Sequence, residues 1–137
     1  MKTTLRFVLD AALRLALLMV VSWLFGWLIL DVLSDAEDAD IGGGILVMLI
    51  ITGVGAAVAA IDGYRRGLPW ALLLWSVVAV LSSISSAVWL NLVQPDTADR
   101  AGLVRDLFDP FWTLWIALPA YAGVLLGFWI RRTGTPH

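Results

Sequence analysis

Four long apolar stretches make up most of this chain and limit what it can fold into. They cover residues 7–30, 43–61, 68–93 and 110–130, about 19 to 26 residues each. A helix needs about 20 apolar residues to cross the hydrocarbon core of a bilayer, so each stretch is long enough to span it. The sequence between them is too short for a soluble domain. We therefore predict an all-α integral membrane protein with four transmembrane helices.

Composition supports the membrane class and argues against a soluble helical domain. The chain has 137 residues, of which 61% are hydrophobic and 15% charged, and its mean hydropathy is +0.90. A surface helix of a soluble protein has polar residues along one face at every turn. Residues 15–30, by contrast, contain a single hydrophilic side chain, that of Ser22.

The distribution of charge predicts how the spans are oriented. One side of the predicted bundle, with both ends of the chain, the inner edge of the first span and the turn at residues 62–67, holds seven of the nine basic residues: Lys2, Arg6, Arg14, Arg65, Arg66, Arg131 and Arg132. The loops at residues 31–42 and 94–109 hold nine of the eleven acidic residues. Because cytoplasmic segments carry an excess of Lys and Arg, we predict a multi-pass protein of the cell membrane with both termini cytoplasmic and both loops outside. The same imbalance argues against a dual-topology protein that inserts both ways up.

The short connections predict one compact bundle, N-in/C-in, rather than separate domains. Short connections favour antiparallel neighbouring helices, so we expect a single four-span domain over residues 1–137. In the second outer loop, Val104 and Leu107 fall on one face of a helix drawn through residues 94–109, and charged residues fall on the other. This pattern favours a short interfacial helix lying on the outer membrane surface.

Tryptophan supports the same placement of the spans. The chain contains eight tryptophans. The indole ring favours the headgroup level, because it is partly apolar while its N–H can stay hydrated. We expect six of them to anchor the spans at the two membrane surfaces: Trp27, Trp70, Trp89, Trp112, Trp115 and Trp129.

Small residues at helical spacing mark candidate association surfaces on the second and fourth spans. The fourth span contains Gly123 and Gly127, and glycines four residues apart let another helix backbone approach closely. Such a surface serves either self-association and docking to a partner, or contact within the same bundle, which is the interpretation that we favour. The candidate packing residues are Gly53, Ala56, Ala57, Ala60, Ala120, Gly123 and Gly127.

Four serines in the third span form a candidate polar path. At 100° per residue they fall within an arc of about 160°. Hydroxyls in hydrocarbon either line a wet route for a solute or bond a neighbouring helix or the carbonyl four residues earlier. We favour helix contact. The four residues are Ser82, Ser83, Ser85 and Ser86.

Ionisable residues are scarce inside the four stretches. Asp10 and Arg14 lie one turn apart near the inner edge of the first span, where they can pair. Asp62 ends the second span beside Arg65 and Arg66, and we interpret it as an interface cap. Carboxylates in mid-membrane are typical of proton-coupled transporters, and we expect none here.

The sequence favours no enzyme class. The only histidine is His137 and there is no cysteine, so Ser–His, Cys-based and His-ligated metal sites are excluded. The acidic run at residues 35–40 lacks the glycine turn and distal glutamate of an EF-hand loop. We expect no catalytic residue, cofactor or metal site, and no surface for nucleic acid.

Three functions fit a four-span membrane protein without an enzyme site. The first is a small non-enzymatic accessory or scaffold subunit, which packs through small-residue helix faces against copies of itself or other membrane subunits. The alternative is a holin-like or other pore-forming protein that permeabilises the membrane by oligomerising. The third is a small-solute transporter that uses the serine face. In all three the lipid bilayer is the immediate partner.

Overall fold

The computed structural model describes residues 2–32, 41–93 and 110–134. In these ranges the protein consists of helices, which are α1 (Lys2–Gly26), its π-helical extension η1 (Trp27–Val32), α2 (Ile41–Arg66), α3 (Leu68–Val93) and α5 (Pro110–Thr133). The prediction of four helices, each long and apolar enough to cross a membrane, is confirmed. Most of the two outer loops, including the predicted interfacial helix, lies outside the described residues.

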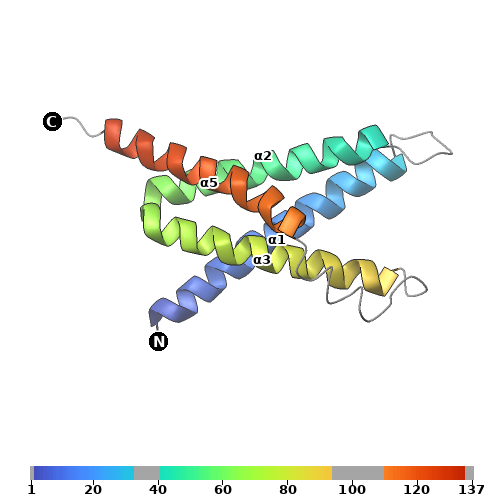
Figure 1. The fold of residues 1–137 in the computed structure, drawn as a ribbon, viewed down its shortest axis with the longest axis horizontal. Helices are drawn as coiled ribbons and strands as arrows, with labels where there is room; N and C mark the ends of the chain where they lie inside the picture. The colour runs from blue at the N-terminus through green and yellow to red at the C-terminus, as the bar shows by residue number, and fades with distance from the viewer. Residues whose placement is uncertain (1, 33–40, 94–109, 135–137) are drawn as a thin grey trace.

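The helices run alternately up and down the molecule. The start of α1, the end of α5 and the turn between α2 and α3 all lie towards one end, at the left of Figure 1. The predicted turn at residues 62–67 is wrong in its extent, since α2 continues to Arg66 and only Gly67 separates it from α3. Gly67 has φ of +86°, a left-handed conformation that glycine adopts without steric cost. One residue of this kind is therefore enough to end α2.

Helices α2 and α5 form the closest helix pair. A Cβ added to Gly123 would overlap the carbonyl oxygen of Ala56, and one added to Gly127 would overlap that of Ala60. The two residues of each pair are 67 positions apart in the sequence. Because this separation is the same for both pairs, the two helices run parallel and in register across the contact. Small residues on both helices thus bring the two backbones together.

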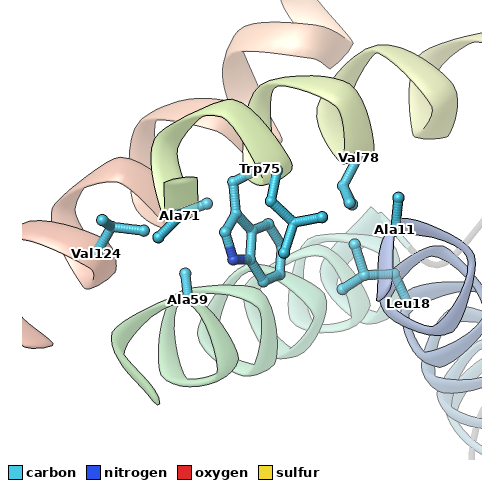
Figure 2. Packing of buried hydrophobic residues seen from close by; sticks show 9 residues of the cluster. Ala11, Leu18, Ala59, Ala71, Trp75, Val78 and Val124 are labelled. Atoms are coloured by element: carbon cyan, nitrogen blue, oxygen red, sulfur yellow. The ribbon is translucent and has the colours of Figure 1, made fainter. Parts of the chain in front are cut away.

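The apolar core is built around α3. Its Leu74, Trp75 and Val78 are fully buried, as is Val124 of α5. Figure 2 shows the side chain of Trp75 pointing from α3 towards α2, with Ala11 and Leu18 of α1 and Val124 of α5 in the same cluster. The ring of Trp75 therefore fills the space where all four helices meet.

Helix α1 is the most peripheral of the four. Only 6% of its most apolar 18-residue window is buried, against 44% in α3. The side of α1 that faces away from the bundle carries large exposed side chains, including Leu5, Leu13 and Trp23. The side chains of Asp10 and Arg14 instead contact α2. Apolar residues outside and charged residues inside are the reverse of a soluble bundle and fit a helix surrounded by lipid.

Candidate functional site

Asp62 of α2 is a buried carboxylate at the junction of three helices. Its side chain is 3% exposed and accepts two hydrogen bonds from the guanidinium of Arg14 in α1, Nη2 to Oδ1 at 2.7 Å and Nε to Oδ2 at 3.1 Å. The indole Nε1 of Trp75 in α3 donates to Oδ2 at 3.2 Å. This corrects the interpretation of Asp62 as an interface cap. Because α2 continues for a further turn, Asp62 lies inside the bundle rather than at its edge.

A second carboxylate closes the arrangement into a ring. Asp10 accepts a hydrogen bond from Arg14 at 3.3 Å, so the predicted pairing within α1 is present. Asp10 also accepts hydrogen bonds from both terminal nitrogens of Arg66. The bond from Nη2 of Arg66 to Oδ1 of Asp10 is 3.0 Å long. Nε of Arg66 in turn lies 3.5 Å from Oδ1 of Asp62. We call these four residues, two acids and two arginines, the charged ring.

The charged ring follows from a repeated spacing in the sequence. Asp10 and Arg14 are four residues apart, as are Asp62 and Arg66, so each pair lies on one face of its helix. Helices α1 and α2 are antiparallel, so the acid of each pair comes level with the arginine of the other. The repeated Asp-x-x-x-Arg spacing, near the start of the first apolar stretch and the end of the second, was the signal that could have identified the ring from sequence.

Aromatic rings cover the charged ring on the side of Arg66. The guanidinium of Arg66 lies 4.5 Å from the ring centroid of Trp70, a cation–π geometry. Phe7 packs edge-on against the same indole at 5.4 Å between ring centroids. Trp70 was predicted to anchor the span at a membrane surface, and here its indole also contacts two other helices.

The chemistry available at the charged ring is pairing rather than proton transfer. Two carboxylates and two guanidinium groups give a net charge of zero, and both carboxylates accept several hydrogen bonds. Only Asp62 is buried, whereas Arg66 is exposed, so the charged ring extends from the interior of the bundle to its surface. At the buried end, additional hydrogen bonds compensate for the loss of water. Within the described residues, no group of three or more His, Cys, Asp or Glu side chains could hold a metal ion.

The predicted small-residue surface divides into two parts. Ala56, Ala60, Gly123 and Gly127 face one another between α2 and α5, and Ala120 is buried in the same bundle. Gly53 and Ala57 are instead exposed, and a Cβ added to Gly53 would meet nothing within 4 Å.

The four predicted serines lie at different depths. Ser82 and Ser83 are buried, and within the described residues their hydroxyls have no hydrogen-bond partner. Ser85 and Ser86 are half-buried. A polar contact that sequence reasoning missed lies nearby in α3, where the hydroxyl of Ser76 is 2.6 Å from that of Tyr121 in α5.

The predicted tryptophan anchors differ in exposure. Trp27, Trp112, Trp115 and Trp129 are exposed, with Trp129 the most open at 62%. The side chain of Trp89 lies outside the described residues.

Comparison with protein-family models, with curated proteins and with solved structures gives no match to this chain.

Proposed function

We propose that this chain is a small non-enzymatic protein of the cell membrane, with both termini cytoplasmic, that acts as an accessory or scaffold subunit. In this proposal it docks onto a second membrane helix, from another protein or a second copy, through the exposed Gly53 and Ala57 of α2. The observation that carries the proposal is the open space beside Gly53.

Association of helices in lipid depends on close backbone approach, which small residues four positions apart permit. Two other pairs with this spacing, Ala56/Ala60 and Gly123/Gly127, are filled by the contact between α2 and α5. Gly53 and Ala57 have the same spacing but face outwards. They are therefore available to a helix from outside the bundle.

The charged ring supports a structural rather than a transport role. Proton-coupled transport needs a carboxylate that gains and loses a proton during the cycle. Asp62 is instead held by Arg14 from α1 and Trp75 from α3, an arrangement that holds three helices together.

The test is the native mass of the protein purified from its own host in mild detergent, for the wild type and for Gly53→Leu. We expect a wild-type assembly larger than one chain and its loss or weakening in the variant. Gly44→Leu is the matched control, because a Cβ at Gly44 also meets nothing within 4 Å. A monomeric wild type, or an assembly unchanged by Gly53→Leu, would count against the proposal.

A second candidate function, passage of a small solute through the bundle, is favoured by the unpartnered hydroxyls of Ser82 and Ser83. It requires saturable uptake into vesicles that falls in Ser82→Ala/Ser83→Ala. The alternative of a pore between several copies needs an outward polar surface, and these two hydroxyls are buried within one chain. We therefore place the holin-like function below the other two. Loss of membrane potential on expression would restore it.

A further inference from the structure

The end of the bundle that holds the turn between α2 and α3 carries positive charge that the described acids do not neutralise. Asp10 and Asp62 are both engaged in the charged ring. Arg65 and Arg131 are exposed, and neither has an acidic partner within the described residues. The charge of these two arginines is therefore directed outwards rather than into the bundle.

The fold fixes the two arginines close to one surface. Gly127 packs against Ala60, four residues before Arg131 and five residues before Arg65, so the ends of α2 and α5 lie side by side. The Nη1 atom of Arg131 lies 4.0 Å from the position that a Cβ on Gly67 would take. Arg131 thus extends over the turn that begins two residues after Arg65.

Exposed aromatic rings accompany the arginines in the sequence and in the structure. Tyr64 precedes Arg65 and is 51% exposed, and Trp129 lies two residues before Arg131 and is 62% exposed. Rings of this type favour the level of lipid headgroups, where guanidinium groups can meet phosphate. The combination places cationic and amphipathic side chains at the same depth.

We propose that Arg65 and Arg131, at the α2–α3 turn, form a binding site for the phosphate headgroup of an anionic phospholipid. The occupant follows from charge complementarity and from the neighbouring apolar helix surface, which contacts acyl chains at the same time. Arg132 lies on the same helix end, with its guanidinium 4.6 Å from the ring centroid of Phe128.

Native mass spectrometry of the detergent-purified full chain tests the site, with phosphatidylglycerol and phosphatidylcholine of the same acyl chains as probes. We expect the wild type to prefer phosphatidylglycerol. A basic residue near an anionic lipid surface contributes about fivefold in affinity, so we expect Arg65→Gln/Arg131→Gln to lower apparent affinity by about 25-fold. Arg100→Gln/Arg105→Gln, in the segment between α3 and α5, removes the same charge and should keep the preference.

Three results would overturn the proposal. They are a wild type without preference for phosphatidylglycerol, an equal loss in the control variant, and displacement of the lipid by millimolar inorganic phosphate, which would assign the site to a soluble anion. Circular dichroism verifies that the variants keep the wild-type helix content. The wild type alone provides an independent measurement, because the preference must weaken as salt concentration rises.

Discussion

Arg14 and Asp62 show how charged side chains are accommodated inside a bundle of helices that are long and apolar enough to cross a membrane. A single charged residue at the centre of a membrane helix costs about 3 kcal/mol on insertion scales. Here Arg14 makes two hydrogen bonds to Asp62 and one to the side chain of Asp10, so its charge is compensated within the protein. The same contacts join α1 to α2, and the peripheral α1 has few buried apolar residues to hold it otherwise.

Replacing Asp62 by Asn keeps the shape of the side chain and removes its charge. The charged ring then has a net charge of +1, and Arg14 loses its main partner. We expect the free energy of unfolding to fall by about 3–5 kcal/mol, the range found when one member of a buried ion pair is removed. Thermal unfolding in detergent, followed by circular dichroism, measures this change.

The control for this variant is Arg65→Gln, which removes a charge from an exposed position and should alter stability little. The combination Asp62→Leu/Arg14→Met removes both members of the pair and should recover much of the loss, since apolar replacements of buried ion pairs are often neutral. A stability of Asp62→Asn equal to that of the wild type would contradict a structural role for the charged ring.

At the scale of helices, α2 and α5 are the most tightly matched pair. Gly63 also takes part, because an added Cβ would lie 2.9 Å from the carbonyl carbon of Val124. Three glycines therefore face backbone atoms that cannot move aside, and the distance between the two helices is set by the absence of side chains.

Gly127→Val should consequently force α2 and α5 apart. We expect the free energy of unfolding to fall by about 1–3 kcal/mol, the usual cost of adding bulk to a packed contact. Gly53→Val introduces the same side chain on α2 where nothing lies within 4 Å, and it should leave monomer stability unchanged. Chemical unfolding in a mixed detergent compares the two variants. Equal stabilities would mean that the close contact between these helices is not required.

At the scale of the whole molecule, most of the described helix surface is apolar outside the arginine-bearing end, while several polar groups lie inside. Large apolar side chains are exposed on all four helices, whereas Asp62, Ser82 and Ser83 are buried. Such a surface is stable only where lipid or another membrane protein covers it. The even number of spans also brings the start of α1 and the end of α5 to the same end of the bundle (Figure 1).

The predicted orientation can be tested with single cysteines, because the natural sequence has none. We expect a membrane-impermeant maleimide to label Asp38→Cys in intact cells. Arg65→Cys and Thr133→Cys should react only after permeabilisation. Labelling of all three positions, or the opposite pattern, would contradict cytoplasmic termini. The cysteine-free parent protein is the control.

The sequence predicted the helices well and the contacts between them less completely. Four apolar stretches of sufficient length define four helices because a lipid-surrounded backbone must satisfy its hydrogen bonds within itself. The charged ring was missed because Asp62 was considered with its neighbours along the chain, Arg65 and Arg66. Its main partner, Arg14, is 48 residues away and becomes adjacent only when α1 and α2 pack antiparallel. Likewise, the small residues of α2 could not be assigned to two different surfaces from the sequence. Only the packing of α5 shows that Ala56 lies at a helix contact while Gly53 is exposed.

The charged ring has a consequence for how the chain is made. Each of the first two helices contains its own acid and arginine one turn apart, so each can enter the bilayer from the translocon carrying a locally neutral pair. Once α2 packs against α1, the acid of each pair also binds the arginine of the other, and none of these contacts involves a residue of α5. The ionic contacts between α1 and α2 therefore need no residue from the later helices, whose Trp75 and glycines pack against the same pair.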